Sequence, residues 1–108
     1  MFVPLCKVAD LREEGELYRF DVRDKPLLVV KFNGSVFVTD STCTHQEADL
    51  SLGMFDQGIV KCPLHGAEFR LDDGDVISGP DGGSPSEIPK LRVYHVKIEN
   101  GMVLVDLS

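Results

Sequence analysis

Two cysteines and two histidines are concentrated in one short stretch of the chain, CTHQEADLSLGMFDQGIVKCPLH, which covers positions 43–65. The whole sequence holds only three residues of each type, so most of its thiol and imidazole groups lie here. Cys43 and His45 form one pair, with one residue between them, and Cys62 and His65 form a second pair, with two residues between them. Thiolate and imidazole donors are typical ligands of zinc, iron and copper, so the pattern indicates a metal centre.

The order of the donors bears on which metal centre it is. A zinc ion is commonly held by two cysteines and two histidines, but its usual spacing pairs cysteine with cysteine and histidine with histidine. Here each half supplies one of each, and sixteen residues separate the halves. A two-iron, two-sulfide (2Fe–2S) cluster suits this order, with Cys43 and Cys62 on one iron and His45 and His65 on the other. A lone zinc ion remains the alternative.

Strand patterns surround both halves of this motif. Runs rich in β-branched and aromatic residues lie at 16–22, 26–32, 35–40, 59–62, 67–71, 75–78, 92–99 and 102–107. Asn-Gly pairs at 33–34 and 100–101 and an Asp-Gly pair at 73–74 predict tight turns between consecutive strands. The sequence therefore predicts an all-β fold, a small antiparallel sandwich or barrel, with one helical turn around 8–15. Each half of the motif is expected where a strand gives way to a loop.

Length and composition indicate one small domain. The chain has 108 residues, 43% of them hydrophobic, and we expect a single domain over 1–108 with its metal-binding loops at about 41–81. A segment rich in proline and glycine, 78–90, is expected to be an ordered surface loop. A core of this size is thin, so a bound cofactor would contribute to stability.

The charge balance argues against several classes of partner. Eighteen acidic and eleven basic residues give a net charge of −7, which opposes binding to nucleic acid and favours a partner with a basic docking face. No apolar run approaches the roughly 20 residues that span a bilayer, and the start, MFVPLCKVADL, lacks the features of a signal peptide. Three cysteines do not make a disulfide framework. We therefore expect a soluble, cytoplasmic protein that binds neither nucleic acid nor a membrane.

The motif resembles that of the Rieske-type 2Fe–2S proteins, whose hallmark is C-x-H, about 15–17 residues, then C-x-x-H. CTH at 43–45 and CPLHG at 62–66 match it, and GAEFRLDDG at 66–74 is similar to the segment that follows in the family. Gly-Pro at 79–80 stands where the family has its proline loop. The resemblance implies the Rieske fold, all-β with a cluster-binding subdomain, and one 2Fe–2S cluster. The ligands that it implies are Cys43, His45, Cys62 and His65.

The resemblance also implies a role. Small, free-standing members of the family are commonly the ferredoxins of bacterial ring-hydroxylating dioxygenase systems. The chain would then be a one-electron carrier, not an enzyme, between an NAD(P)H-dependent flavin reductase and a terminal oxygenase, and a monomer. The alternatives are a Rieske-like small subunit of a nitrite reductase and, from another class, a zinc-stapled interaction module. The remaining histidine, His95, lies in an alternating strand pattern, which favours an ordinary strand residue over a metal ligand. No dinucleotide-binding fingerprint follows a strand, so the chain is not expected to bind NADH itself.

Differences from the family pattern predict the electronic properties of the cluster. Gln46 stands where relatives often have a glycine after CTH. Rieske proteins of respiratory complexes carry one more cysteine in each loop, joined in a disulfide, where this chain has Ala48 and Leu64. They also have a serine and a tyrosine whose hydroxyls donate hydrogen bonds to sulfur, where this chain has Ala67 and Phe69. Without these donors we expect a reduction potential near the low end of the Rieske range, about −150 mV.

Other residues are candidates for secondary roles beside the motif, with ordinary loop packing and a solvated polar surface as the alternatives. The candidates for an apolar collar over the cluster are Leu50, Leu52, Met54 and Leu64. The candidates for bracing its third side are Pro80 and Pro85. The candidates for an acidic docking rim are Gln46, Glu47, Asp49, Asp81 and Glu87. Cys6, far from the motif, is expected to be a buried thiol in an N-terminal strand.

Overall fold

The computed structural model describes residues 1–44 and 47–108. Its strands are β1 (Phe2–Lys7), β2 (Tyr18–Val22), β3 (Lys25–Phe32), β4 (Ser35–Asp40), β5 (Met54–Asp56), β6 (Ile59–Lys61), β7 (Glu68–Arg70), β8 (Val76–Ser78), β9 (Val93–Tyr94), β10 (Val96–Glu99) and β11 (Met102–Asp106). Short 3₁₀ turns are η1 (Val8–Asp10), η2 (Leu50–Leu52), η3 (Pro80–Gly82) and η4 (Pro85–Glu87). The described residues contain no α-helix, and hence none long and apolar enough to cross a membrane.

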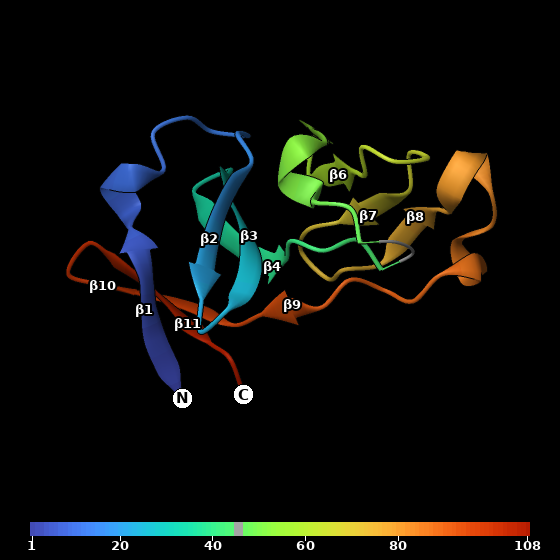
Figure 1. Cartoon of the computed structure of the whole chain (residues 1–108). Helices are drawn as coiled ribbons and strands as arrows, with labels where there is room; N and C mark the ends of the chain where they lie inside the picture. Colours follow the sequence, from blue (N-terminus) through green and yellow to red (C-terminus); the bar gives the residue numbers. More distant parts are fainter. Residues whose placement is uncertain (45–46) are drawn as a thin grey trace.

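The described strands form sheets that are antiparallel throughout, which confirms the predicted fold class. One sheet has the order β1–β11–β10, a second has the order β2–β3–β4–β9, and a third has the order β5–β6–β7–β8. Figure 1 shows the first two sheets together at one end of the molecule, with both termini, and the third sheet at the other end beside η2, η3 and η4. We call this third sheet the small sheet.

Strand β3 is buried on both of its faces and joins two hydrophobic cores. Leu27, Leu28, Val29 and Val30 are all fully buried. Successive side chains of a strand point to opposite faces, so Leu27 and Val29 enter a core built on the first sheet, whereas Leu28 and Val30 enter a core that contains Cys43. This position explains why the run PLLVV is continuously apolar rather than alternating.

The predicted Asn-Gly turns are confirmed. Asn33 and Gly34 join β3 to β4, and both residues have left-handed backbone dihedrals, with φ of 52° and 76°. The turn from β2 to β3 was not predicted, because Arg23 and Asp24 adopt the same left-handed pair of conformations without a glycine. Strand β5 is a further difference, because Met54–Asp56 lies between the two halves of the motif, where the sequence predicts a loop.

The predicted strand over 92–99 is interrupted at His95, which is exposed. Val93–Tyr94 pairs with β4 in the second sheet, and Val96–Glu99 pairs with β11 in the first sheet. The chain therefore changes sheets at His95, and the alternating pattern runs through the change because both halves remain extended. The predicted helical turn over 8–15 is limited to the 3₁₀ turn η1.

Tyr94 is buried at the junction of these two sheets and is hydrogen-bonded to a carboxylate. Its hydroxyl donates to Asp40 Oδ1 at 2.5 Å, and the Arg92 guanidinium lies 4.9 Å from the ring centroid. Burial raises the pKa of the Tyr94 phenol far above its usual value near 10, and the hydrogen bond to Asp40 and its charge add to the rise. The neutral phenol is therefore part of the folded structure.

We expect this phenol to make stability fall at alkaline pH. Because its pKa is higher in the folded than in the unfolded chain, its contribution is complete below pH 10 and is lost as pH rises toward the folded pKa, by about 1.4 kcal/mol per pH unit. Denaturant unfolding at pH 9 and pH 11 measures the loss in the native protein, in Tyr94→Phe and in the control Tyr18→Phe. The free energy of unfolding should fall less between these two pH values in Tyr94→Phe than in the other two proteins. An equal fall in all three proteins would show that the Tyr94 phenol does not cause the loss.

Candidate metal centre

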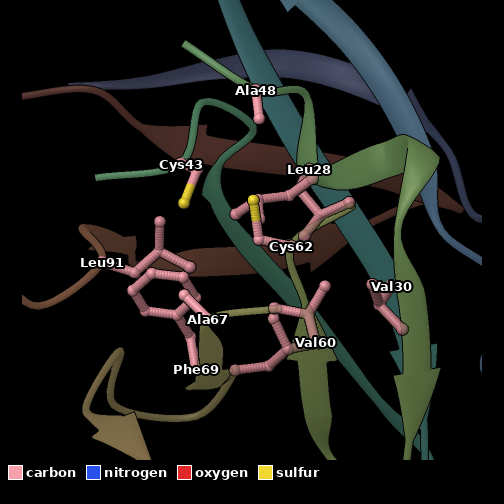
Figure 2. Close-up of a cluster of buried hydrophobic side chains, with 11 residues drawn as sticks. Leu28, Val30, Cys43, Ala48, Val60, Cys62, Ala67, Phe69 and Leu91 are labelled. Atoms are coloured by element: carbon pink, nitrogen blue, oxygen red, sulfur yellow. The ribbon is translucent and has the colours of Figure 1, made fainter. Parts of the chain in front are cut away.

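Cys43 and Cys62 meet at the end of the core beside the small sheet. Cys43 lies in the loop after β4, Cys62 follows β6 directly, and the two residues are 4% and 2% exposed. Figure 2 shows both sulfur atoms facing one space bordered by Ala48 on one side and by Ala67 and Leu91 on the other. The fold therefore places the two cysteines next to each other.

The environment of the Cys62 thiol disfavours its ionisation in the metal-free chain. Burial raises the pKa of Cys62 to about 11 and the neighbouring Cys43 adds to the rise, although the Leu64 backbone N–H donates to the Cys62 sulfur and opposes it. A metal ion binds thiolate, so metal binding here displaces a proton from the Cys62 thiol, which otherwise retains it. The binding free energy of the metal must include this cost.

Both cysteine loops are closed in the same way. The Cys43 N–H donates to the Ala48 carbonyl at 2.9 Å, and the Cys62 N–H donates to the Ala67 carbonyl at 2.8 Å. In each loop the cysteine is thus bonded to the backbone of the residue five positions later. The two alanines are buried, at 6% and 0% exposure, so small apolar side chains close each loop.

His65 lies at the tip of the second loop, in a left-handed backbone conformation. Its φ is 65° and that of Gly66 is 70°, and histidine adopts this region more readily than most residues do. The imidazole is 48% exposed, and its Nδ1 lies 3.4 Å from Asp81 Oδ2. The ring is therefore at the molecular surface, whereas the sulfur of Cys62, in the same loop, belongs to the core.

The structure brings part of the predicted ligand set together. Cys43 and Cys62 are adjacent, and His65 lies in the loop that follows Cys62. His45 and Gln46 lie outside the described residues. Within 1–44 and 47–108, no three side chains of the Cys, His, Asp and Glu types are close enough to hold one metal ion.

The proline loop at 79–90 contacts both cysteine loops. The Asp81 N–H donates to the His65 carbonyl, and Asp81 itself has a left-handed φ of 55°. At the other end of this loop, the Thr44 hydroxyl donates to the Pro89 carbonyl at 2.7 Å. These two contacts are made by Asp81 and Pro89, so bracing of the cluster by Pro80 and Pro85 stays a prediction.

Of the four residues expected to form a collar, Leu50 is completely buried in the core beside Cys43. Leu52, Met54 and Leu64 are 75%, 71% and 48% exposed. Leu52 and Met54 line a groove of about 360 Å³ beside Cys62. Leu52, Met54 and Leu64 therefore form an exposed apolar border of the site, whereas Leu50 belongs to the hydrophobic core.

Asp49 was expected on an acidic rim, but its carboxylate is hydrogen-bonded within the protein. Oδ1 accepts from the Ser41 hydroxyl at 2.6 Å and from the Ser51 N–H and hydroxyl at 2.9 and 2.7 Å, and Oδ2 accepts from Arg19 Nη1 at 2.8 Å. Partial burial alone would raise the pKa of Asp49, but the bonds from Ser41, Ser51 and Arg19 outweigh it and lower the pKa to about 2. The Asp-x-Ser pattern is a signal for such a turn that was missed.

Comparisons with known proteins agree with this geometry. The sequence profile of the Rieske [2Fe-2S] domain matches residues 1–95. The chain is 38% identical over 104 residues to the ferredoxin component of biphenyl 2,3-dioxygenase from Rhodococcus jostii (strain RHA1), covering 96% of this chain and 91% of that protein. The solved structure of Sphingomonas yanoikuyae B1 ferredoxin matches with a TM-score of 0.87 and 33% identity over the full length of both chains.

A further match is a chain from the complex of reduced oxygenase and oxidized ferredoxin in carbazole 1,9a-dioxygenase. Its TM-score is 0.82 at 30% identity, with 96% of this chain and 100% of that chain covered. The chain described here belongs to the Rieske [2Fe-2S] family. It carries one 2Fe–2S cluster of the Rieske type, and this sets aside the zinc-stapled interaction module as an alternative.

The donor chemistry of the site fits such a cluster. A Rieske centre needs two thiolates on one iron and two imidazoles on the other. Two buried thiols face one space here, and an imidazole lies on the solvent side of the second loop. The Leu64 N–H that donates to the Cys62 sulfur is the kind of outer contact that orients a metal ligand and adjusts its electron density.

Proposed function

We propose that this chain is a Rieske ferredoxin that carries one electron at a time from an NAD(P)H-dependent flavin reductase to the terminal oxygenase of a ring-hydroxylating dioxygenase system. The observation that carries this proposal is similarity to ferredoxin components over nearly their whole length, 91% for the biphenyl and 86% for the naphthalene component. In this proposal the chain is an electron carrier and not an enzyme. It is a cytoplasmic monomer, a single domain over 1–108 with its cluster-binding loops at about 41–81.

Within this proposal Cys43 and Cys62 hold one iron, and His45 and His65 hold the other. The bound cluster takes up and gives back one electron. Two thiolates balance the charge of the oxidised core and the imidazoles add none, so reduction is easier than at an all-cysteine site. The burial of both cysteines keeps water from the sulfurs, and the half-exposed ring of His65 provides an edge that a partner can approach.

The partners follow from the same relatives. A solved complex of oxygenase and ferredoxin in carbazole 1,9a-dioxygenase supports direct transfer from a carrier of this fold to an oxygenase. The electron source is inferred from the chemistry, because a two-electron nicotinamide donor needs a flavin to release electrons singly to a one-electron carrier.

A reconstituted system tests the proposal. Reduced chain is mixed in a stopped-flow instrument with a purified ring-hydroxylating oxygenase, and the visible absorption of the chain is followed. We expect rapid reoxidation, and we expect hydroxylated product only when reductase, chain and oxygenase are all present. A chain with a full cluster that no such oxygenase reoxidises would overturn the assignment to a dioxygenase system.

We expect association with the partner to weaken as salt rises. The chain has a formal charge of −7, and reduction of its cluster adds one more negative charge. Attraction to a basic docking face is screened beyond about 10 Å at 0.1 M ionic strength, so the second-order rate of electron transfer should fall steeply with added salt. A rate that stays constant would instead indicate that the apolar border at Leu52, Met54 and Leu64 dominates docking.

A further inference from the structure

One carboxylate, that of Asp49, closes the base of the first cysteine loop. It accepts hydrogen bonds from Ser41, which is 1% exposed and lies before Cys43, and from Ser51, which lies after the loop. The backbone adds a bond of 2.7 Å from the Leu50 N–H to the Ser41 carbonyl. Both ends of the loop are therefore held by the same side chain and its immediate neighbours.

The same carboxylate connects the first loop to the second. By accepting from the Ser51 N–H, Asp49 caps the 3₁₀ turn η2, which is followed by Gly53 as its C-cap. A Cβ atom on Gly53 would lie 2.0 Å from the Lys61 carbonyl oxygen, so the end of η2 packs directly on the backbone of the residue before Cys62. A short chain of contacts thus runs from Asp49 to both cysteines.

Arg19 anchors this assembly to strand β2. Its Nη1 binds Asp49 Oδ2 at 2.8 Å, and its Nε binds Asp21 Oδ1 at 2.9 Å. The two carboxylates share one guanidinium, but Asp49 alone of the two is bonded to Ser41 and Ser51. Hydrogen bonds to an ionised carboxylate are shorter and stronger than neutral ones, so this arrangement is rigid.

We propose that Asp49 is a positioning residue that sets the placement of Cys43 relative to Cys62, and with it the retention and the electronic structure of the cluster. This proposal rests on the ligand set proposed above. In this proposal hydrogen bonds hold the two loops together. A disulfide between the loops cannot do so, since neither loop contains a second cysteine. It also predicts that a carboxylate with no contact to the cluster ligands affects the spectrum of the cluster.

The test uses holoprotein and compares Asp49→Ala with Asp21→Ala. Both variants remove one negative charge from the same guanidinium, and only the first releases Ser41 and Ser51. We expect iron to be lost to an excess of chelator roughly 10- to 100-fold faster from Asp49→Ala than from the native protein. Its reduced form should show altered g values by electron paramagnetic resonance (EPR), whereas Asp21→Ala should match the native protein in both measurements.

Ser51→Ala is the second variant, in case Asp49→Ala does not fold. It removes one hydroxyl donor and leaves the carboxylate and Arg19 in place, so we expect a smaller acceleration of iron loss and a smaller change in g values. The proposal would be overturned if Asp49→Ala and Asp21→Ala lost iron at equal rates and gave equal EPR spectra. If Asp49→Ala does not fold, the same comparison is made between Ser51→Ala and Asp21→Ala. Failure of the proposed function is distinguishable, because it appears in the native protein as an absent cluster or as a cluster that no oxygenase oxidises.

Discussion

We expect that replacing Cys43 by alanine removes both irons from the purified protein, whereas replacing Cys6 by alanine leaves both in place. The two residues are comparable in burial, at 4% and 7% exposure, but they lie in different hydrophobic cores. Cys43 faces Cys62 beside the small sheet, and Cys6 lies on β1 among the strands of the first sheet. The measurement is the content of iron and acid-labile sulfide per chain in both variants.

The comparison separates a ligand from a structural thiol. Cys6→Ala deletes a buried sulfur and should cost stability alone, on the order of 1 kcal/mol for a small apolar group. Cys43→Ala should lose the cluster and also destabilise the small sheet, because metal binding is coupled to folding. If Cys43→Ala kept two irons, or if Cys6→Ala lost them, the proposed ligand set would be wrong.

The second large effect concerns the reduction potential, which we expect at about −150 mV for the native protein. Ala67 and Phe69 are completely buried in the same core as both cysteines, and neither side chain carries a hydrogen-bond donor (Figure 2). A donor that favours the reduced cluster by about 1 kcal/mol raises a one-electron potential by about 40 mV. Ala67→Ser and Phe69→Tyr should therefore each raise the potential, measured by protein-film voltammetry.

A hydroxyl in the other core provides the control for this experiment. Val103→Thr places a hydroxyl among buried residues of the first sheet and should leave the potential unchanged. A native potential above about +100 mV would contradict the assignment to a dioxygenase system, because that value lies in the upper part of the Rieske range. If the native potential is low but neither hydroxyl raises it, the proposed function stands. The missing donors at positions 67 and 69 are then not the cause of the low potential.

Local patterns in the sequence predicted the parts of the fold that depend on local chemistry. Asn-Gly turns and alternating strands depend on nearest neighbours, and they are found as expected at 33–34 and 100–101. The change of sheet at His95 depends on which distant strand each half meets, and the strand pattern is the same on both sides. The continuous burial of β3 likewise depends on two cores, one that draws on both ends of the chain and one built largely from its middle.

In the candidate site, too, features set by neighbouring residues were predictable and features set by distant residues were not. The spacing of cysteine and histidine pointed to the metal centre, because ligands on one loop must be near one another in sequence. The role of Asp49 was missed, since its contacts with Arg19 and Ser41 join residues 30 and 8 positions apart. Gly53 was missed for the same reason, because the Lys61 carbonyl on strand β6 leaves no room for a side chain at this position.

The central claim is that two imidazoles and two thiolates hold the cluster of this chain. The most direct measurement is pulsed EPR of the reduced native protein, which detects magnetic coupling between the unpaired electron and nitrogen nuclei bound to iron. We predict two distinct, strongly coupled nitrogens, one from His45 and one from His65. A spectrum without strongly coupled nitrogen would show an all-sulfur site and would contradict the account.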